Sequence, residues 1–177
     1  MFSVASLTLS LAFISNRSFP GAPRAKPYLA ALLILAGCGG GGTAKWQQVQ
    51  GEGFSFNAPS AWTVEDSAAT NGDVDRVEVA IFRLLRAYEP ARRAAVAREL
   101  DRVAARVAAQ LRGSVRSRRS LETGGLDARS YVIDFDGKTE EITFALDGRR
   151  EYQLLCRRTA NGDDAPCVEL LRSFHVG

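Results

Sequence analysis

The chain has 177 residues, of which 46% are hydrophobic and 24% are charged, and its formal net charge is +3. This composition excludes a disordered or fibrous protein and allows one globular domain of ordinary size with a short extra segment. The net charge belongs to that segment, because residues 1–37 contain Arg17, Arg24 and Lys26 and no acidic residue. The rest of the chain is neutral on balance, so the basic composition does not predict binding to nucleic acid.

The first part of the chain has the organisation of a secretory signal. Arg24 and Lys26 precede an apolar run over 28–35, which is too short to span a bilayer but has the length of a signal's apolar region. The sequence Leu-Ala-Gly-Cys that ends at Cys38 resembles the lipobox of bacterial lipoproteins. The resemblance implies that Cys38 accepts a diacylglyceryl group and that the chain is cleaved before it. A plain signal peptide or a buried apolar helix is the alternative interpretation.

A lipidated Cys38 would anchor the protein by itself, since two or more acyl chains hold firmly where one binds only marginally. We therefore expect a signal segment over 1–37, a Gly-rich tether over 38–45 and one domain over 46–177, on the extracytoplasmic face of a cell membrane. The pattern does not distinguish an inner from an outer membrane. Residues 1–20 exceed the usual bacterial n-region, so we expect the true start downstream, at an alternative start codon.

The segment before residue 90 predicts short strands. Alternation of apolar and polar residues places them at 46–50, 54–57, 62–64 and 76–83. Pro59 interrupts the first ladder because it lacks a backbone N–H. The small and polar segment 67–73 predicts a loop. In the last strand, Val77, Val79 and Ile81 are expected on one face.

The clearest helix begins at Pro90 and extends to Arg112, where Gly113 supplies a stop. Apolar residues recur with the helical period at Val96, Leu100, Val103, Val107 and Leu111. Frequent alanines raise the helical propensity of the segment. One apolar stripe and a charged outer face indicate a helix packed on a sheet.

From Val115 onward the pattern predicts an antiparallel meander. Its turn signals are Gly124-Gly125, Asp136-Gly137 and Asp147-Gly148. After a loop over 161–164, Pro166 opens a short last helix. The order of strands, long helix, strands and short helix predicts an α+β fold, with a central antiparallel sheet flanked by one long and one short helix.

The sequence Gly-Phe-Ser-Phe-Asn-Ala-Pro-Ser-Ala-Trp at 53–62 resembles the opening of PsbP/Mog1-like domains, which include small bacterial lipoproteins. The predicted element order agrees with this resemblance over roughly 46–176. The resemblance implies an α/β/α sandwich and a protein that stabilises or assembles other proteins rather than an enzyme. It carries over no binding residue, because its Phe, Pro and Trp positions serve the core and a turn.

Cys156 and Cys167 lie 11 positions apart, and export to an oxidising compartment favours a disulfide between them. Two buried thiols are the alternative. A metal site would need four ligands, and the chain has a single histidine, His175, so we predict neither a metal nor a cofactor. We interpret His175 as a residue at the end of the last helix, beside Phe174.

Two acidic turns, at 134–137 and 161–164, have the composition of calcium-binding loops. Neither continues to the distal glutamate that a full loop needs, so turn chemistry explains both. No acid, base and nucleophile converge in the sequence, and we therefore do not predict an enzyme.

Arginines concentrate on the outer face of the long helix and directly after it. They are Arg98, Arg102, Arg106, Arg116, Arg118 and Arg119, with Arg112 between the two groups. Like charges in a row repel unless a partner, or the neighbouring Glu99 and Asp101, relieves them. A solvated face is one interpretation. The functional one is docking on anionic head groups or on an acidic protein.

These features predict a membrane-tethered, non-catalytic interaction or assembly module with a protein partner. A second hypothesis is a carrier in which the sheet and the long helix enclose an apolar ligand or lipid. An enzyme is the third. We leave the identity of the partner and the oligomeric state open.

Overall fold

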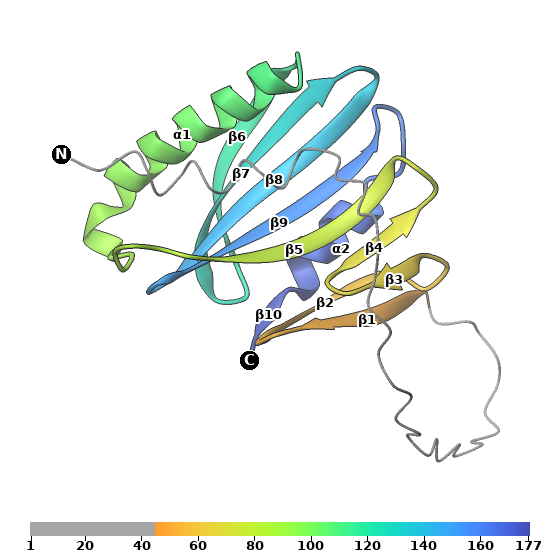
Figure 1. The fold of residues 1–177 in the computed structure, drawn as a ribbon, viewed down its shortest axis with the longest axis horizontal. Coiled ribbons are helices and arrows are strands. Elements are labelled where there is room, and N and C mark those ends of the chain that lie inside the picture. Colours follow the sequence, from red (N-terminus) through yellow and green to blue (C-terminus); the bar gives the residue numbers. More distant parts are fainter. Residues whose placement is uncertain (1–44) are drawn as a thin grey trace, which may run out of the picture.

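The computed structural model describes residues 45–177, which fold into two antiparallel sheets and two α-helices (Figure 1). The smaller sheet has the order β1 (Trp46–Gly51), β2 (Phe54–Pro59) and β10 (His175–Val176). The larger sheet has the order β3 (Thr63–Glu65), β4 (Ala68–Asn71), β5 (Asp75–Arg83), β9 (Arg150–Thr159), β8 (Lys138–Asp147), β7 (Leu126–Phe135) and β6 (Ser114–Thr123). Helix α1 spans Arg93–Gln110 after a 3-10 turn over Pro90–Arg92, and α2 spans Ala165–Ser173.

Helix α1 covers one face of the large sheet over β6 and β7 (Figure 1). Its buried stripe of Leu100, Val103 and Val107 packs with apolar side chains of β7 and β8. Those side chains are Tyr131, Ile133, Ile142 and Phe144. The predicted helical periodicity is therefore confirmed, because every buried residue of α1 lies on that stripe or next to it.

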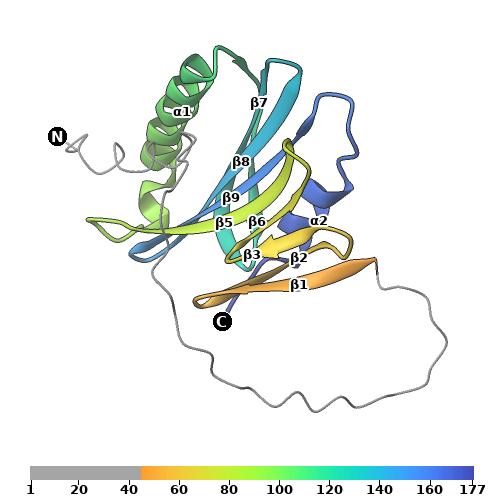
Figure 2. The same cartoon turned by 45° about the vertical axis from the view of Figure 1, so that its right-hand side comes forward.

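The opposite face of the large sheet carries a second core, covered by α2 and the small sheet (Figure 2). Aromatic rings form its centre. The ring centroids of Tyr152 and Phe174 are 5.5 Å apart, and the centroid of Phe54 lies 6.3 Å from each of them. Both faces of the large sheet are thus covered. The result is a layered α+β sandwich, as the sequence predicted.

The turns predicted from Gly-Gly and Asp-Gly pairs are confirmed. Asp136 and Gly137 both have positive φ, at 44° and 68°, as the hairpin turn between β7 and β8 requires. The last helix begins at Ala165, next to the predicted Pro166. Local chemistry of this kind acts within a few residues and does not depend on the rest of the fold.

Two local predictions are wrong. Residues 67–73 are not a loop, since Ala68–Asn71 form β4 between β3 and β5. Ala68 and Ala69 are small enough to be buried there in spite of a weak strand propensity. His175 does not end the last helix but pairs in β10 with Ser55 of β2. Val77, Val79 and Ile81 lie on one face of β5, as predicted, although Ile81 remains 38% exposed.

Cys156 of β9 and Cys167 of α2 form a disulfide, with their Cα atoms 5.3 Å apart. Both residues are buried in the second core. The bond holds α2 against the large sheet and closes a loop of 11 residues. The expected pairing is therefore present.

We expect the Cys156→Ala/Cys167→Ala variant to lose about 3 kcal/mol of unfolding free energy, since a loop of this size restricts the unfolded chain by that amount. Urea denaturation of the oxidised wild type, the reduced wild type and the variant measures the loss. The reduced wild type should be weakened to a similar degree. Equal stability of the oxidised and reduced wild type would contradict the prediction.

Two carboxylates are buried on the face of the large sheet that α1 covers. Glu151 accepts a hydrogen bond from Gln153 at 2.7 Å, and its burial raises its pKa. Glu140 accepts a hydrogen bond from Arg157 at 2.7 Å, and burial raises its pKa although the guanidinium opposes this. Glu140 lies opposite Arg157 of β9. Arg157 is six positions from Glu151 along that strand, so Glu140 and Glu151 are about 20 Å apart. The two carboxyl groups therefore do not form an acid and base pair.

We expect the Glu151→Gln variant to match the wild type at pH 4 and to be more stable at pH 8, by about 1 kcal/mol. A carboxyl group with a raised pKa stabilises the fold most when protonated, and this contribution is lost as the pH rises through its folded pKa. Urea titrations at both pH values measure the difference. The exposed Glu122→Gln variant is the control and should show no such divergence. A loss of stability in Glu151→Gln at both pH values would refute the explanation.

Candidate functional site

The positive charge of the domain is concentrated in α1 and β6. Residues 93–123 contain eight arginines against Glu99, Asp101 and Glu122, which gives a net charge of 8 − 3 = +5. The chain beyond residue 37 is neutral on balance, so the other parts of it carry the compensating negative charge. This segment is therefore the place to look for an anionic partner.

On α1, Arg98 and Arg102 are exposed on the side that faces away from the apolar stripe, and Arg106 is half-buried. Arg102 pairs with Glu99 at 2.6 Å, one turn earlier in the helix, and remains 66% exposed. Within residues 45–177, the side chains of Arg98 and Arg106 have no ion pair or hydrogen bond. Their charges are available to an external anion.

Strand β6 lies at the edge of the large sheet, and its first seven residues, 114–120, are all exposed. Each of its arginines is close to one carboxylate. Arg116 lies 3.4 Å from Asp134, Arg118 lies 3.7 Å from Asp101, and Arg119 lies 2.9 Å from Glu141. All three side chains remain more than half exposed, so each pair contributes about 0–1 kcal/mol.

The arginines of β6 do not all point the same way. Arg118 is opposite Tyr131 and reaches toward α1, whereas Arg119 is opposite Ser130 and reaches the other face of the sheet. A bulge between Val115 and Ser117 sets this register. We define the arginine surface as the α1-side group. It consists of Arg98, Arg102, Arg106 and Arg118.

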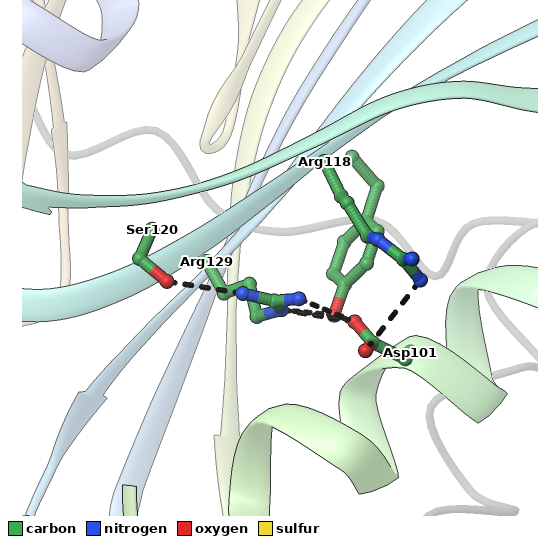
Figure 3. Close-up of polar contacts among 5 residues, drawn as sticks. Asp101, Arg118, Ser120 and Arg129 are labelled. Atoms are coloured by element: carbon green, nitrogen blue, oxygen red, sulfur yellow. Dashed lines mark hydrogen bonds and ion pairs between the residues drawn. The ribbon is translucent and has the colours of Figure 1, made fainter. Parts of the chain in front are cut away.

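Asp101 connects α1 to the sheet beside the arginine surface (Figure 3). Its Oδ1 accepts hydrogen bonds from the Tyr131 hydroxyl at 2.7 Å and from Arg129 Nε and Nη2 at 2.9 and 2.8 Å. Arg129 Nη1 also donates to Ser120 at 3.0 Å. One carboxylate thus joins a helix to two neighbouring strands, and it holds Arg118 beside the helix.

The contacts within this cluster shift the pKa values of Asp101 and Tyr131 in opposite directions. Burial alone would raise the pKa of Asp101, but hydrogen bonds from Tyr131 and Arg129, with the charges of Arg129 and Arg118, lower it overall. Burial and the hydrogen bond to Asp101 raise the pKa of Tyr131. Asp101 therefore stays ionised and Tyr131 stays a hydrogen-bond donor at physiological pH.

Sequence reasoning treated Asp101 only as a charge near the arginines, and it did not identify Arg129 or Ser120. One signal was available. Tyr131 falls on the buried face of its strand, and a buried tyrosine hydroxyl needs a hydrogen-bond partner. Which carboxylate meets it depends on the docking of α1, which no local pattern specifies.

We expect Asp101→Ala to cost about 2–4 kcal/mol of unfolding free energy, because it leaves the buried Tyr131 hydroxyl and Arg129 without their acceptor. Asp101→Asn should cost less, since it keeps an acceptor oxygen. The pKa of Asp101 is lowered, so its contribution is present at neutral pH and is lost as the pH falls below about 4.

Urea denaturation between pH 2.5 and pH 7 tests both statements when it resolves differences of about 0.5 kcal/mol in the free energy of unfolding. Glu99→Ala, on the same helix in an exposed pair with Arg102, is the matched control and should stay within that margin. Equal losses for Asp101→Ala and Glu99→Ala would show that the cluster does not hold the helix.

Two clefts bear on the carrier hypothesis. The space between α1 and the sheet at Val96 and Phe144 has a volume of about 20 Å³, which holds about one water molecule. A larger cleft of about 250 Å³ lies beside the disulfide, but Lys45, Asp75 and Arg158 contribute to its lining. Neither cleft has both the size and the apolar lining that an enclosed lipid needs.

The remaining candidate residues serve local structure or lie elsewhere. Asp134 accepts a hydrogen bond from Thr139 at 2.8 Å, and Asp163 accepts one from the backbone N–H of Ala165 at 2.9 Å. Among residues 45–177, no three His, Cys, Asp or Glu side chains are placed to hold a metal ion. Cys38 lies outside the described residues. No helix within the described part of the chain is long and apolar enough to cross a membrane.

The layers described above define a PsbP-like α+β sandwich, and the solved structure of one other protein has this fold. Cyanobacterial PsbP (CyanoP) from Synechocystis sp. PCC 6803 superposes with a TM-score of 0.53 at 16% identity, over 81% of this chain and 99% of that chain. A protein from Bacteroides thetaiotaomicron VPI-5482 superposes with a TM-score of 0.45 at 17% identity, over 71% of this chain and 45% of that chain.

No family model matches the chain, and no curated protein matches it. At 16% identity, the likeness to CyanoP shows the fold alone. The expected PsbP-like architecture is therefore confirmed, and the roles of individual residues have to be argued from this chain.

Proposed function

We propose that the protein is a membrane-anchored, extracytoplasmic interaction module. In this proposal lipid on Cys38 holds the domain at the membrane, and the arginine surface binds an anionic partner protein. The observation that supports it best is the net charge of +5 over residues 93–123 in a domain that is otherwise negative. Arg98 and Arg106 bring charges to this surface without a partner within residues 45–177.

The mutual repulsion of these arginines costs stability, and a solvated face would gain nothing from keeping them together. The Asp101 cluster limits part of the cost by fixing Arg118 and Arg129 on one carboxylate. An acidic partner would relieve the rest. Complementary charge of this kind mainly increases the rate and specificity of association.

The anchor restricts where that partner can be. A segment of eight residues, 38–45, spans at most about 28 Å when fully extended. The partner must therefore present its acidic surface close to the same membrane. An acidic protein held at the same membrane fits this position better than a soluble acidic protein, which the domain would have to meet by diffusion.

Two substitutions in the intact chain test the proposal in cells. Cys38→Ser should move the protein from the membrane fraction to the soluble fraction, because it removes the lipid acceptor. A photo-crosslinker at position 105, on the outer side of α1, should capture a defined partner in membranes. The triple variant Arg98→Glu/Arg102→Glu/Arg106→Glu should reduce that capture at least tenfold and make the residual capture insensitive to salt.

The matched control is Arg83→Glu/Arg149→Glu, which reverses two exposed arginines that belong to neither α1 nor β6. It should leave both fractionation and capture unchanged. Retention of the Cys38→Ser variant in the membrane fraction would overturn the anchor. Capture that the triple variant leaves intact would overturn the role of the arginine surface.

A further inference from the structure

We propose that β6 is a strand-addition site for an extended acidic segment of the partner. The segment would pair with the backbone of β6, and its carboxylates would lie against Arg116, Arg118 and Arg119. This inference rests on the proposed function and names the kind of partner that the surface accepts. It follows from the free edge of β6, from the placement of its arginines and from the weakness of their present ion pairs.

The edge of β6 is long and open. Within the described residues β6 pairs only with β7, so the backbone groups on its outer side have no strand partner. The opposite edge of the sheet, β3, has only three residues. The exposed stretch 114–120 offers about 23 Å for pairing. After the bulge, the ladder with β7 is regular from Ser117 to Thr123, so an added strand would find a regular template there.

The arginines lie on both faces of this edge. Arg118 reaches the α1 side, where it is 3.7 Å from Asp101, and Arg119 reaches the other side, where it is 2.9 Å from Glu141. Successive side chains of an added strand also point to opposite faces. Consecutive acidic residues in that strand would therefore each meet an arginine. A single flat anionic surface could contact only one of these two arginines.

The same charges select against the most available competitor, a second copy of this chain. Two β6 edges placed together would bring the arginines of one strand against those of the other, and like charges on paired strands are destabilising. Charged residues at a sheet edge normally prevent such pairing. Here they leave the edge open to a strand of opposite charge.

The present partners of the arginines give way at small cost. Arg116 and Arg119 keep 52% and 62% of their side-chain surface exposed although they pair with Asp134 and Glu141. Exposed pairs of this kind contribute about 0–1 kcal/mol each. Backbone hydrogen bonds along the edge would add affinity that the arginines alone do not supply.

The test uses the purified full-length protein and a fluorescent eight-residue peptide with consecutive glutamates at its centre. The comparison peptide has the same sequence and charge, but every backbone nitrogen is methylated. The unmodified peptide should bind saturably, and the methylated one should bind at least tenfold more weakly because it has lost its backbone donors. Amide chemical shifts should change at residues 117–120.

Two variants separate this inference from the proposed function. Arg118→Gln/Arg119→Gln should weaken peptide binding at least tenfold, with circular dichroism confirming that the variant is folded. Arg98→Gln/Arg102→Gln, on the helix, should change it less than twofold. Equal binding of both peptides, or a larger loss in the helix variant, would overturn strand addition while leaving charge-driven docking intact. No binding of either peptide would overturn the inference, and the cross-linking experiment would still decide the proposed function.

Discussion

The hydrogen bonds of Asp101 determine how the surface of this protein is arranged. The apolar stripe of α1 brings the helix onto the sheet, but apolar contact has little directional preference. The Asp101 carboxylate adds direction, since it accepts hydrogen bonds from Tyr131 and Arg129 within 2.9 Å. It fixes the rotation of α1 about its own axis, and with it the positions of Arg98 and Arg102 relative to β6. The arginine surface therefore depends on a partly buried contact, in which Asp101 keeps 27% and Arg129 keeps 19% of its side-chain surface exposed.

The position of a strand within the large sheet explains what its residues are used for. The central strands β8 and β9 are covered on both faces, and some of their polar side chains, such as Thr143 and Glu151, are buried. The first seven residues of the edge strand β6 are exposed, so it tolerates a run of arginines and serines that β8 could not bury. Charged side chains can therefore occupy the edge strand without disturbing the packing of the central strands.

Much of this fold was predictable because its signals are local. Helix α1, the Asp-Gly turns and the final helix each follow from residues within one element. Strand β4 was missed because Ala68 and Ala69 resemble a loop until the core that covers them is known. The candidate site was predictable as a concentration of arginines but not as a shape. The bulge after Val115 determines which face of the sheet Arg118 and Arg119 each occupy, and the contact from Asp101 to Tyr131 spans 30 residues.

The weakness of each exposed ion pair is compatible with a specific interaction if the protein is confined to a membrane. Each pair contributes about 0–1 kcal/mol, and in free solution a few of them would give only a transient complex. A short tether changes this, because it holds the domain near any partner on the same surface and raises the effective concentration, which reaches the millimolar range for short linkers. Under the proposed anchoring, modest affinity from β6 and α1 is sufficient for occupancy. Reversibility then follows from the same weakness, since four of the arginines have a carboxylate within the domain to return to. These are Arg102, Arg116, Arg118 and Arg119.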